Sequence, residues 1–239
     1  MMMDTFSFSR LSLYQTCPYR FYRKYVDKVP EPTTLPLALG KAVHKAIEDK
    51  MKGVSHSEAI LNGLVEAKFH PEVNIEELSK LTSRAPLHKI KGETEVYFKI
   101  PLSNESNTPK IQGFIDVIDG NQIFDWKTNR VPYDIKDTFQ IALYAWAMSQ
   151  VKGIHEVTGT LFFLRFRRRN AFVFRQQEME QARVWAYRTA KEIQGKLDIV
   201  KMIPELRDEL FHSTPSSYCS HCPLAIECFK KFSPIATVI

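Results

Sequence analysis

The sequence contains no uninterrupted apolar run near the roughly 18 residues that a membrane-spanning helix needs. Its first ten residues, Met1 to Arg10, also lack a basic segment followed by an apolar one, the pattern of an export signal. We therefore expect a cytoplasmic protein without a membrane segment. Internal repeats, low-complexity tracts and clear domain linkers are missing too, and 239 residues suit one large domain or two small ones. A hydrophobic content of 44% excludes a largely disordered chain.

Cysteine is scarce, and four residues are too few to cross-link a chain of this length by disulfides. Their placement is uneven, because Cys17 stands alone whereas Cys219, Cys222 and Cys228 lie within ten positions. Thiolates at such short spacing can converge on one metal ion or cluster, with Cys17 as the fourth ligand. The alternatives are four ordinary buried thiols, or Zn²⁺ bound by all four cysteines or by three of them and His221.

Positive charge is in modest excess, with 33 Lys and Arg against 27 Asp and Glu and a net charge of +6. The basic residues are densest at Arg20 to Lys28 and at Arg165 to Arg169, where Tyr and Phe lie among them. Such interleaving is typical of a nucleic-acid groove, in which phosphates meet cations and bases stack on rings. The same segments also fit a solvated helix face and a charged hairpin tip.

Hydrophobic periodicity divides the chain into three parts. Residues 7–90 have helical spacing, with two short helices flanking Cys17 and further helices over 37–50, 57–69 and part of 71–88. Residues 93–176 form the sheet core, with strands over 93–100, 110–118, 122–127, 156–166 and 170–176 and a helix over 133–150. A long amphipathic helix over 178–200 precedes the cysteine segment, which ends at 229. The pattern predicts an α/β fold, a mixed sheet of about five strands flanked by helices, in a single domain over residues 1–239.

Two carboxylates and a lysine lie on neighbouring strands of this predicted sheet. Asp116 is late in one strand, a tight turn follows, and alternation places Asp125 and Lys127 on the same face of the next strand. Carboxylate oxygens from adjacent strands suit Mg²⁺ or Mn²⁺, and a nearby lysine can orient water and offset phosphate charge. This combination favours phosphodiester hydrolysis, although a surface ion pair has the same spacing.

Several ordered motifs together resemble one nuclease family. The complete set spans residues 7 to 229 and comprises Ser9 to Phe21, Gly40 to His44, Gly113 to Asp116, Asp125 to Lys127, Gln140 to Tyr144, and the three C-terminal cysteines. It resembles the RecB-type branch of the PD-(D/E)XK nuclease superfamily. With the cysteines, it is similar to the iron–sulfur subgroup that includes CRISPR-associated exonucleases and AddB-type recombination nucleases. The resemblance implies a restriction-endonuclease-like core whose N- and C-terminal segments are joined by a metal cluster.

The resemblance also implies roles for single residues. Asp116, Asp125 and the backbone carbonyl of Trp126 would hold the divalent metal, with His44 as a further ligand or organiser of the site. Lys127 would position the attacking water, and Gln140 and Tyr144 would orient the lysine or contact DNA. Glu95 begins a strand where similar proteins often have a glutamate. The cluster would be [4Fe–4S], bound by Cys17, Cys219, Cys222 and Cys228 without His221.

The predicted function is therefore metal-dependent DNA cleavage, exonucleolytic on single-stranded ends, in CRISPR adaptation or recombination repair. DNA is the expected partner, and a helicase or a CRISPR integrase is a candidate protein partner. Two other classes of function are compatible with parts of the pattern. One is a non-catalytic module that binds DNA ends, and the other is a structural protein stabilised by zinc.

Overall fold

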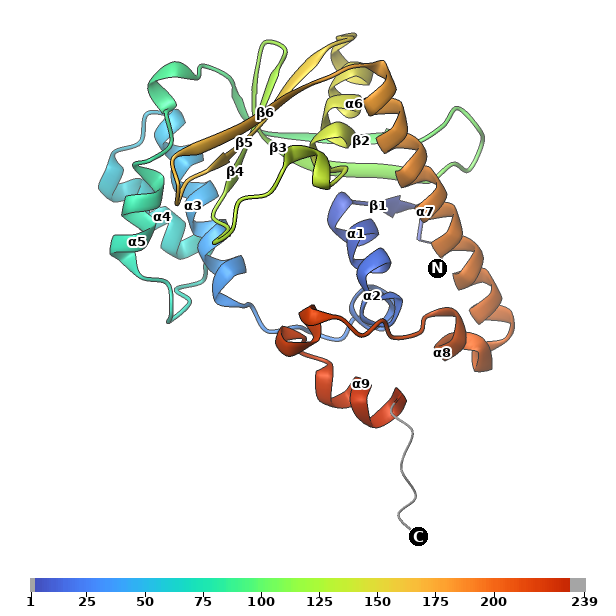
Figure 1. The fold of residues 1–239 in the computed structure, drawn as a ribbon. Coiled ribbons are helices and arrows are strands. Elements are labelled where there is room, and N and C mark those ends of the chain that lie inside the picture. Colours follow the sequence, from blue (N-terminus) through green and yellow to red (C-terminus); the bar gives the residue numbers. More distant parts are fainter. Residues whose placement is uncertain (1–2, 233–239) are drawn as a thin grey trace. The chain divides into compact units, whose positions relative to one another are not determined.

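The computed structural model describes residues 3–232, which fall into two compact units. The first unit combines residues up to 32, residues 101–110 and residues from 186 onward, and the second combines residues 33–100 and 111–185. Figure 1 shows the order of the elements along the chain by colour. The boundary between the units falls inside β3 (Lys110–Asp119) and inside α7 (Gln176–Met202).

A mixed sheet forms the centre of the second unit. Its strands are β2 (Glu93–Pro101), most of β3, β4 (Gln122–Lys127), β5 (Val157–Phe163) and β6 (Arg168–Phe174). β3 pairs with both β2 and β4, the β3–β4 and β5–β6 pairs are antiparallel, and the β4–β5 pair is parallel. A sixth strand of the chain, β1 (Thr5–Phe6), belongs to the first unit. The predicted α/β class and mixed sheet are confirmed, with six strands rather than about five.

Helices flank this sheet within the second unit: α3 (Leu35–Met51), α4 (His56–Glu66), α5 (Ile75–Thr82) and α6 (Gln140–Lys152). A short 3₁₀ turn, η1 (Leu87–Lys89), follows α5. The side chains of Ser55 and Asn74 cap α4 and α5 by accepting backbone N–H bonds from Glu58 and Glu77. Buried residues of α3 pack in one core with Trp126 of β4, which fixes the face of the helix that meets the sheet.

The helix expected over 133–150 begins seven residues later than predicted. The Asp134 side chain accepts from the Lys136 N–H while the Asp137 side chain accepts from the Asp134 N–H, and this capping box holds the 3₁₀ turn η2 (Ile135–Asp137). Thr138 is then extended at φ −137° and ψ 155°. Because an extended residue cannot continue a helix, α6 starts only at Gln140.

The first unit contains the two short helices expected around Cys17, α1 (Phe8–Thr16) and α2 (Pro18–Tyr25), and Pro18 occupies the first turn of α2. After α7 come the 3₁₀ turn η3 (Pro204–Leu206), α8 (Arg207–Leu210), the 3₁₀ turn η4 (Ser217–His221) and α9 (Ala225–Phe232). Rings from distant segments fill the core of this unit. Tyr14 lies edge-on to both Phe21 and Phe211, with ring centroids 5.5 and 6.2 Å away.

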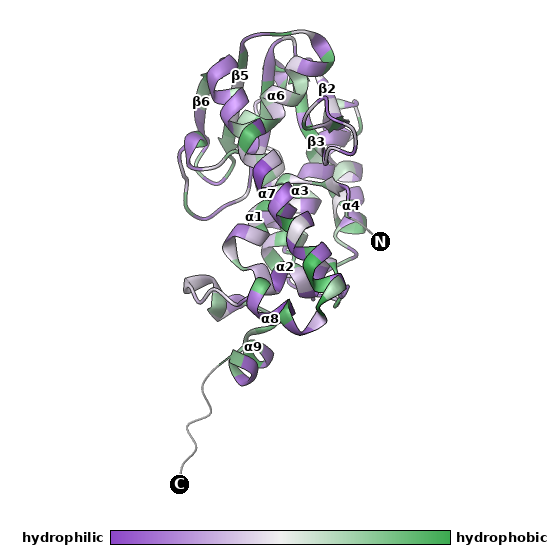
Figure 2. Ribbon diagram, turned by 90° about the vertical axis from the view of Figure 1, so that its right-hand side faces the viewer, coloured by the Kyte–Doolittle hydropathy of each residue, from purple (hydrophilic) through white to green (hydrophobic). Residues whose placement is uncertain are grey.

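Figure 2 shows hydrophilic and hydrophobic residues mixed over the helices and strands. In keeping with this, none of the helices within residues 3–232 combines the length and the apolar character needed to cross a membrane.

Candidate active site

The site is built on β3 and β4, whose two-residue connection brings their ends side by side. Pairing of Val117 with Phe124 places Asp116 next to Asp125 and Trp126. The Trp126 N–H donates to Asp116 Oδ2 over 2.8 Å. The ammonium of Lys127 lies 2.7 Å from Asp125 Oδ2, because alternation along β4 gives these two side chains one face. The structure thus brings together the two carboxylates and the lysine that the sequence singled out.

His44 reaches this group from α3. Its Nδ1 lies 3.3 Å from Asp116 Oδ2 and its Nε2 lies 2.8 Å from the Trp126 carbonyl oxygen. Since a carbonyl only accepts, Nε2 carries the proton in that bond. Burial by itself disfavours the imidazolium, yet the neighbouring Asp116 carboxylate raises the pKa of His44 to about 9. The ring is therefore positioned between the Asp116 carboxylate and the Trp126 carbonyl.

Glu95 of β2 completes a compact set of ligating side chains. Within residues 3–232, His44, Glu95 and Asp116 form the one group of three or more such side chains whose ligand atoms all lie within 4.8 Å of one another. Glu95 has φ +52°, a left-handed conformation that costs energy for a residue other than glycine. Burial, reinforced by Asp116, raises the pKa of Glu95 to about 7. The sequence pattern puts Glu95 at the start of a strand, and only the pairing of β2 with β3 brings it to Asp116.

Asp125 is buried beside Asp116, and Lys127 is its ion-pair partner. The residue is 3% exposed, and the Lys127 ammonium lies 2.7 Å from its Oδ2. Burial raises the pKa of Asp125, and the Asp116 carboxylate adds to this against the opposing effect of Lys127. Two largely buried carboxylates side by side attract a cation, and the single charge of Lys127 offsets only one of them. The residues present therefore fit a hard divalent ion bound by oxygen and nitrogen ligands.

Gln140 and Tyr144 stand one helical turn apart at the start of α6. The Lys127 ammonium donates to Gln140 Oε1 over 2.9 Å, and Gln140 Nε2 donates to the Tyr144 hydroxyl over 3.4 Å. Burial raises the pKa of Tyr144 to about 12, so its hydroxyl stays protonated. Lys127 is thus held between a carboxylate and an amide, with its ammonium fixed in direction.

Tyr133 also lies beside Lys127, although the sequence did not single it out. Its ring meets Phe163 edge-on with centroids 5.3 Å apart. Burial raises the pKa of Tyr133 while the adjacent Lys127 opposes the rise. No motif in the sequence marks Tyr133, which is the first residue of the helix expected over 133–150 and precedes η2 in the structure.

A model of the PD-(D/E)XK nuclease superfamily matches residues 5–229 of the chain. The chain belongs to this superfamily. Its members are generally metal-dependent nucleases, and the group of His44, Glu95 and Asp116 is a candidate metal site of that kind. A comparison with curated proteins finds no match. Among solved structures, the chain is similar to one described as "Crystal structure of SSO0001", with 16% identity, coverage of 98% of this chain and 89% of that chain, and a TM-score of 0.45.

The four cysteines of this nuclease-superfamily chain lie in the first unit around one cavity of about 250 Å³. The other walls are largely apolar and include Tyr19, Leu224 and Phe232. Burial raises the pKa of Cys228, and the other three thiols contribute in the same direction. Within the described part of the chain, however, no three of the four sulfur atoms come within 4.8 Å of one another. His221 is absent from the described lining of the cavity, and its Nδ1 lies 2.8 Å from Ser220 Oγ.

The two basic segments differ in how many of their charges are available. In Arg20 to Lys28, Arg20 and Lys24 both pair with Glu31, which holds the pKa of that carboxyl low against the effect of burial. Arg23 pairs with Asp27 and Glu227. In the second segment, Arg165 is also engaged, but Arg167, Arg168 and Arg169 are exposed. Ion pairing therefore leaves the β5–β6 turn as the more open of the two.

Gly113 of β3 is required by close packing beside the site. A Cβ atom there would lie 3.0 Å from carbon atoms of the Phe98 ring and 3.3 Å from the Tyr144 ring. Overpacking of this kind typically costs about 1–3 kcal/mol. We expect Gly113→Ala to lower the free energy of unfolding by that amount in a urea titration. Gly195 of α7 is the matched control, because a Cβ atom there would meet nothing within 4 Å, so Gly195→Ala should stabilise the protein by up to about 1 kcal/mol. Equal stability of Gly113→Ala and the wild type would contradict the packing argument.

Proposed function

We propose that the chain is a divalent-metal-dependent deoxyribonuclease of the RecB-type branch, with both units forming one nuclease domain over residues 1–239. His44, Asp116, Asp125 and the Trp126 carbonyl would hold Mg²⁺ or Mn²⁺, and Glu95 would add a further oxygen ligand. The observation that carries this proposal is the compact group of His44, Glu95 and Asp116, adjacent to the buried ion pair of Asp125 and Lys127.

A divalent cation bound by these residues would polarise the scissile phosphate and lower the pKa of a water molecule. The remaining tasks fall to the chain itself. Lys127, held by Asp125 and Gln140, presents a fixed positive charge that can align a water and offset the charge of the phosphate. Tyr144 holds Gln140 in place through its hydroxyl. Phosphodiester hydrolysis by this arrangement needs no covalent enzyme intermediate.

The proposed substrate is DNA with single-stranded ends, degraded exonucleolytically. The proposed setting is CRISPR adaptation or recombination repair, with a helicase or an integrase as partner. The sequence motifs shared with those nucleases support this choice of branch, and the exposed arginines of the β5–β6 turn supply positive charge for a backbone.

The direct test uses end-labelled single- and double-stranded oligonucleotides with anaerobically purified protein in Mg²⁺, Mn²⁺ or EDTA. We expect mononucleotides or short products from single strands, in either metal and not in EDTA. Cleavage that persists in EDTA would contradict the metal dependence, and internal cleavage of circular single strands would contradict an exonuclease.

We also propose a [4Fe–4S] cluster bound by Cys17, Cys219, Cys222 and Cys228. Four thiols around one apolar cavity of about 250 Å³ support it. Zinc is the less suitable occupant, because Zn–S bonds of about 2.3 Å bring tetrahedral thiolates to about 3.8 Å from one another, closer than any three of the sulfur atoms lie here. A four-iron cube binds each thiolate at its own corner and accepts a wider spacing.

The exposed turn between β5 and β6 provides a test of DNA handling. Arg168→Ala/Arg169→Ala removes two exposed charges at the start of β6, next to that turn. We expect weaker binding to single strands of every sequence and a slope of log K against log salt that is shallower by about 1.4, since each phosphate contact contributes about 0.7. The rate at saturating DNA should stay near wild type. Unchanged affinity and slope would mean that the turn is simply solvated.

A further inference from the structure

Three cavities of the second unit form a row that starts at the candidate metal site, and each shares wall residues with the next. The first, of about 640 Å³, is lined by His44, Glu95 and Asp116 and extends to Pro36 at the start of α3. Pro36 also lines the second, of about 300 Å³. Glu77 and Arg165 line both the second and a third cavity of about 500 Å³ beside α5. Each cavity therefore adjoins the next, and all three lie within one compact unit.

The charge of the walls changes along this series. Carboxylates dominate around the metal-site cavity, where Lys45 is already paired with Glu48 and Asp49. Beyond Pro36, four cationic side chains face two carboxylates. The cations are Arg130, Arg165, Lys80 and Arg84, and the carboxylates are Glu76 and Glu77. The far part of the series is thus suited to a polyanion, whereas the near part is suited to cations.

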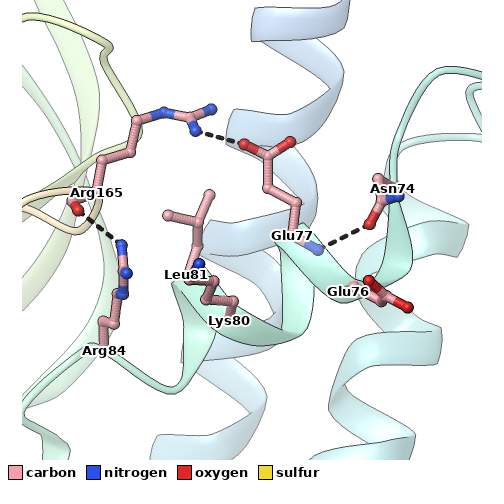
Figure 3. A pocket seen from close by; sticks show the side chains of 7 residues that line it. All are labelled: Asn74, Glu76, Glu77, Lys80, Leu81, Arg84 and Arg165. Carbon is pink, nitrogen blue, oxygen red and sulfur yellow. Dashed lines mark hydrogen bonds and ion pairs between the residues drawn. The ribbon is translucent and has the colours of Figure 1, made fainter.

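One ion pair in this wall uses a charge of each sign, so the excess of cations over carboxylates stays the same. Glu77 pairs with Arg165, so this carboxylate is neutralised inside the wall (Figure 3). Arg84 Nη1 donates hydrogen bonds to the carbonyl oxygens of Leu164 and Arg165, over 3.3 and 2.6 Å. Its Nε is buried without a hydrogen-bond partner among the described residues. No carboxylate is bonded to Arg84 in the contacts described, so its charge remains for a ligand.

The middle cavity combines charge with apolar surface. Leu35, Pro36 and Leu39 line it together with the exposed Arg130. A single nucleic-acid strand offers the same two chemistries, with sugars and base faces for apolar contact and phosphates for cations. Arg165 Nε donates to the carbonyl oxygen of Thr128 over 2.8 Å, one residue after Lys127. This hydrogen bond connects the wall shared by the second and third cavities to the end of β4, the strand that carries Asp125 and Lys127.

We propose that the three cavities form one groove that binds an extended polynucleotide strand, with its scissile phosphate at the metal site and upstream or downstream phosphates on Arg130, Lys80 and Arg84. This proposal rests on the proposed nuclease function and adds a backbone-binding track several nucleotides away from the chemistry. Arg84 and Arg165 also shape the wall through backbone bonds, whereas Lys80 and Arg130 contribute exposed charge that can be removed without disturbing those bonds.

The test measures how binding depends on strand length. Fluorescence anisotropy in EDTA would follow single strands of about 3 to 15 nucleotides bound to the full chain, with wild type and Lys80→Ala/Arg130→Ala compared. We expect the wild-type affinity to rise with length until the far cavities are filled. The double variant should bind the shortest strands like wild type, lose about five- to tenfold on the longest, and show a salt slope shallower by about 1.4 on those alone.

The matched control is Lys91→Ala/Lys99→Ala, which removes the same charge from exposed positions that are not among the described lining of the three cavities. It should retain the wild-type length dependence. An equal loss in the control, or a wild-type length dependence in Lys80→Ala/Arg130→Ala, would overturn the groove. Cleavage by wild type in Mg²⁺ is measured separately. Absence of cleavage with intact length-dependent binding would refute the proposed nuclease function and not the groove.

Discussion

Asp116→Asn/Asp125→Asn is expected to reduce DNA cleavage by about a thousandfold or more at saturating Mg²⁺. Both carboxylates lose the charge that would bind the cation, and electrostatic stabilisation of a reacting phosphate accounts for losses of this size. Asparagine is preferred to alanine at position 125, because its amide oxygen can still accept a hydrogen bond from the largely buried Lys127 ammonium. Breaking a buried pair by removing one member costs about 3–5 kcal/mol, which would confound folding with catalysis.

The measurement is initial cleavage of an end-labelled strand, with thermal unfolding and Mn²⁺ titration calorimetry on the same samples. Asp119→Asn is the matched control. It lies on the same strand, and its side-chain oxygen can still accept the Lys91 N–H bond that Asp119 accepts over 3.1 Å. We expect full activity and metal binding in the control. Wild-type cleavage by the double variant would refute the assigned site, and loss of activity with unchanged Mn²⁺ binding would place the ion elsewhere.

Cys17→Ser should lower both the iron content and the thermal stability of anaerobically purified protein. Cys17 is about 200 positions from the other three cysteines, so a shared cluster would close a very long loop and contribute folding free energy, as structural metal sites do. A loss of several kcal/mol would lower Tm by about 10 °C for a chain of this size. Cys222→Ser should have the same effect, because it would remove another ligand of the proposed cluster.

His221→Ala is the control for the cysteine variants. It lies next to Cys222 in sequence, but it is not among the described residues that line the cysteine cavity. We expect normal iron, normal Tm and the broad absorption near about 400 nm typical of iron–sulfur proteins. Full iron in Cys17→Ser would exclude Cys17 as a ligand. Stoichiometric zinc and no iron in the anaerobic wild type would replace the cluster by a zinc site.

Local spacing was enough to predict much of the fold and part of the site. The two-residue turn between β3 and β4, together with period-two alternation, brings Asp116, Asp125 and Lys127 together whatever surrounds them. Gln140 and Tyr144 share a helix face because they are four residues apart. The helix over 133–150 was predicted too long, since the Asp134 capping box was not weighed against the hydrophobic period.

The sequence by itself therefore determined the features that depend on neighbours along the chain: the strands, the turn, the pairing of acid and lysine, and the clustering of three cysteines. Tertiary structure decided the rest. The contact of His44 with the Trp126 carbonyl, over 82 positions, requires α3 to pack on β4. The left-handed backbone of Glu95 and the contacts of Arg165 with Glu77 and Thr128 likewise depend on which elements pack together. Periodicity describes the environment of one segment, whereas these contacts are selected by burial and by charge pairing between segments that are distant in sequence.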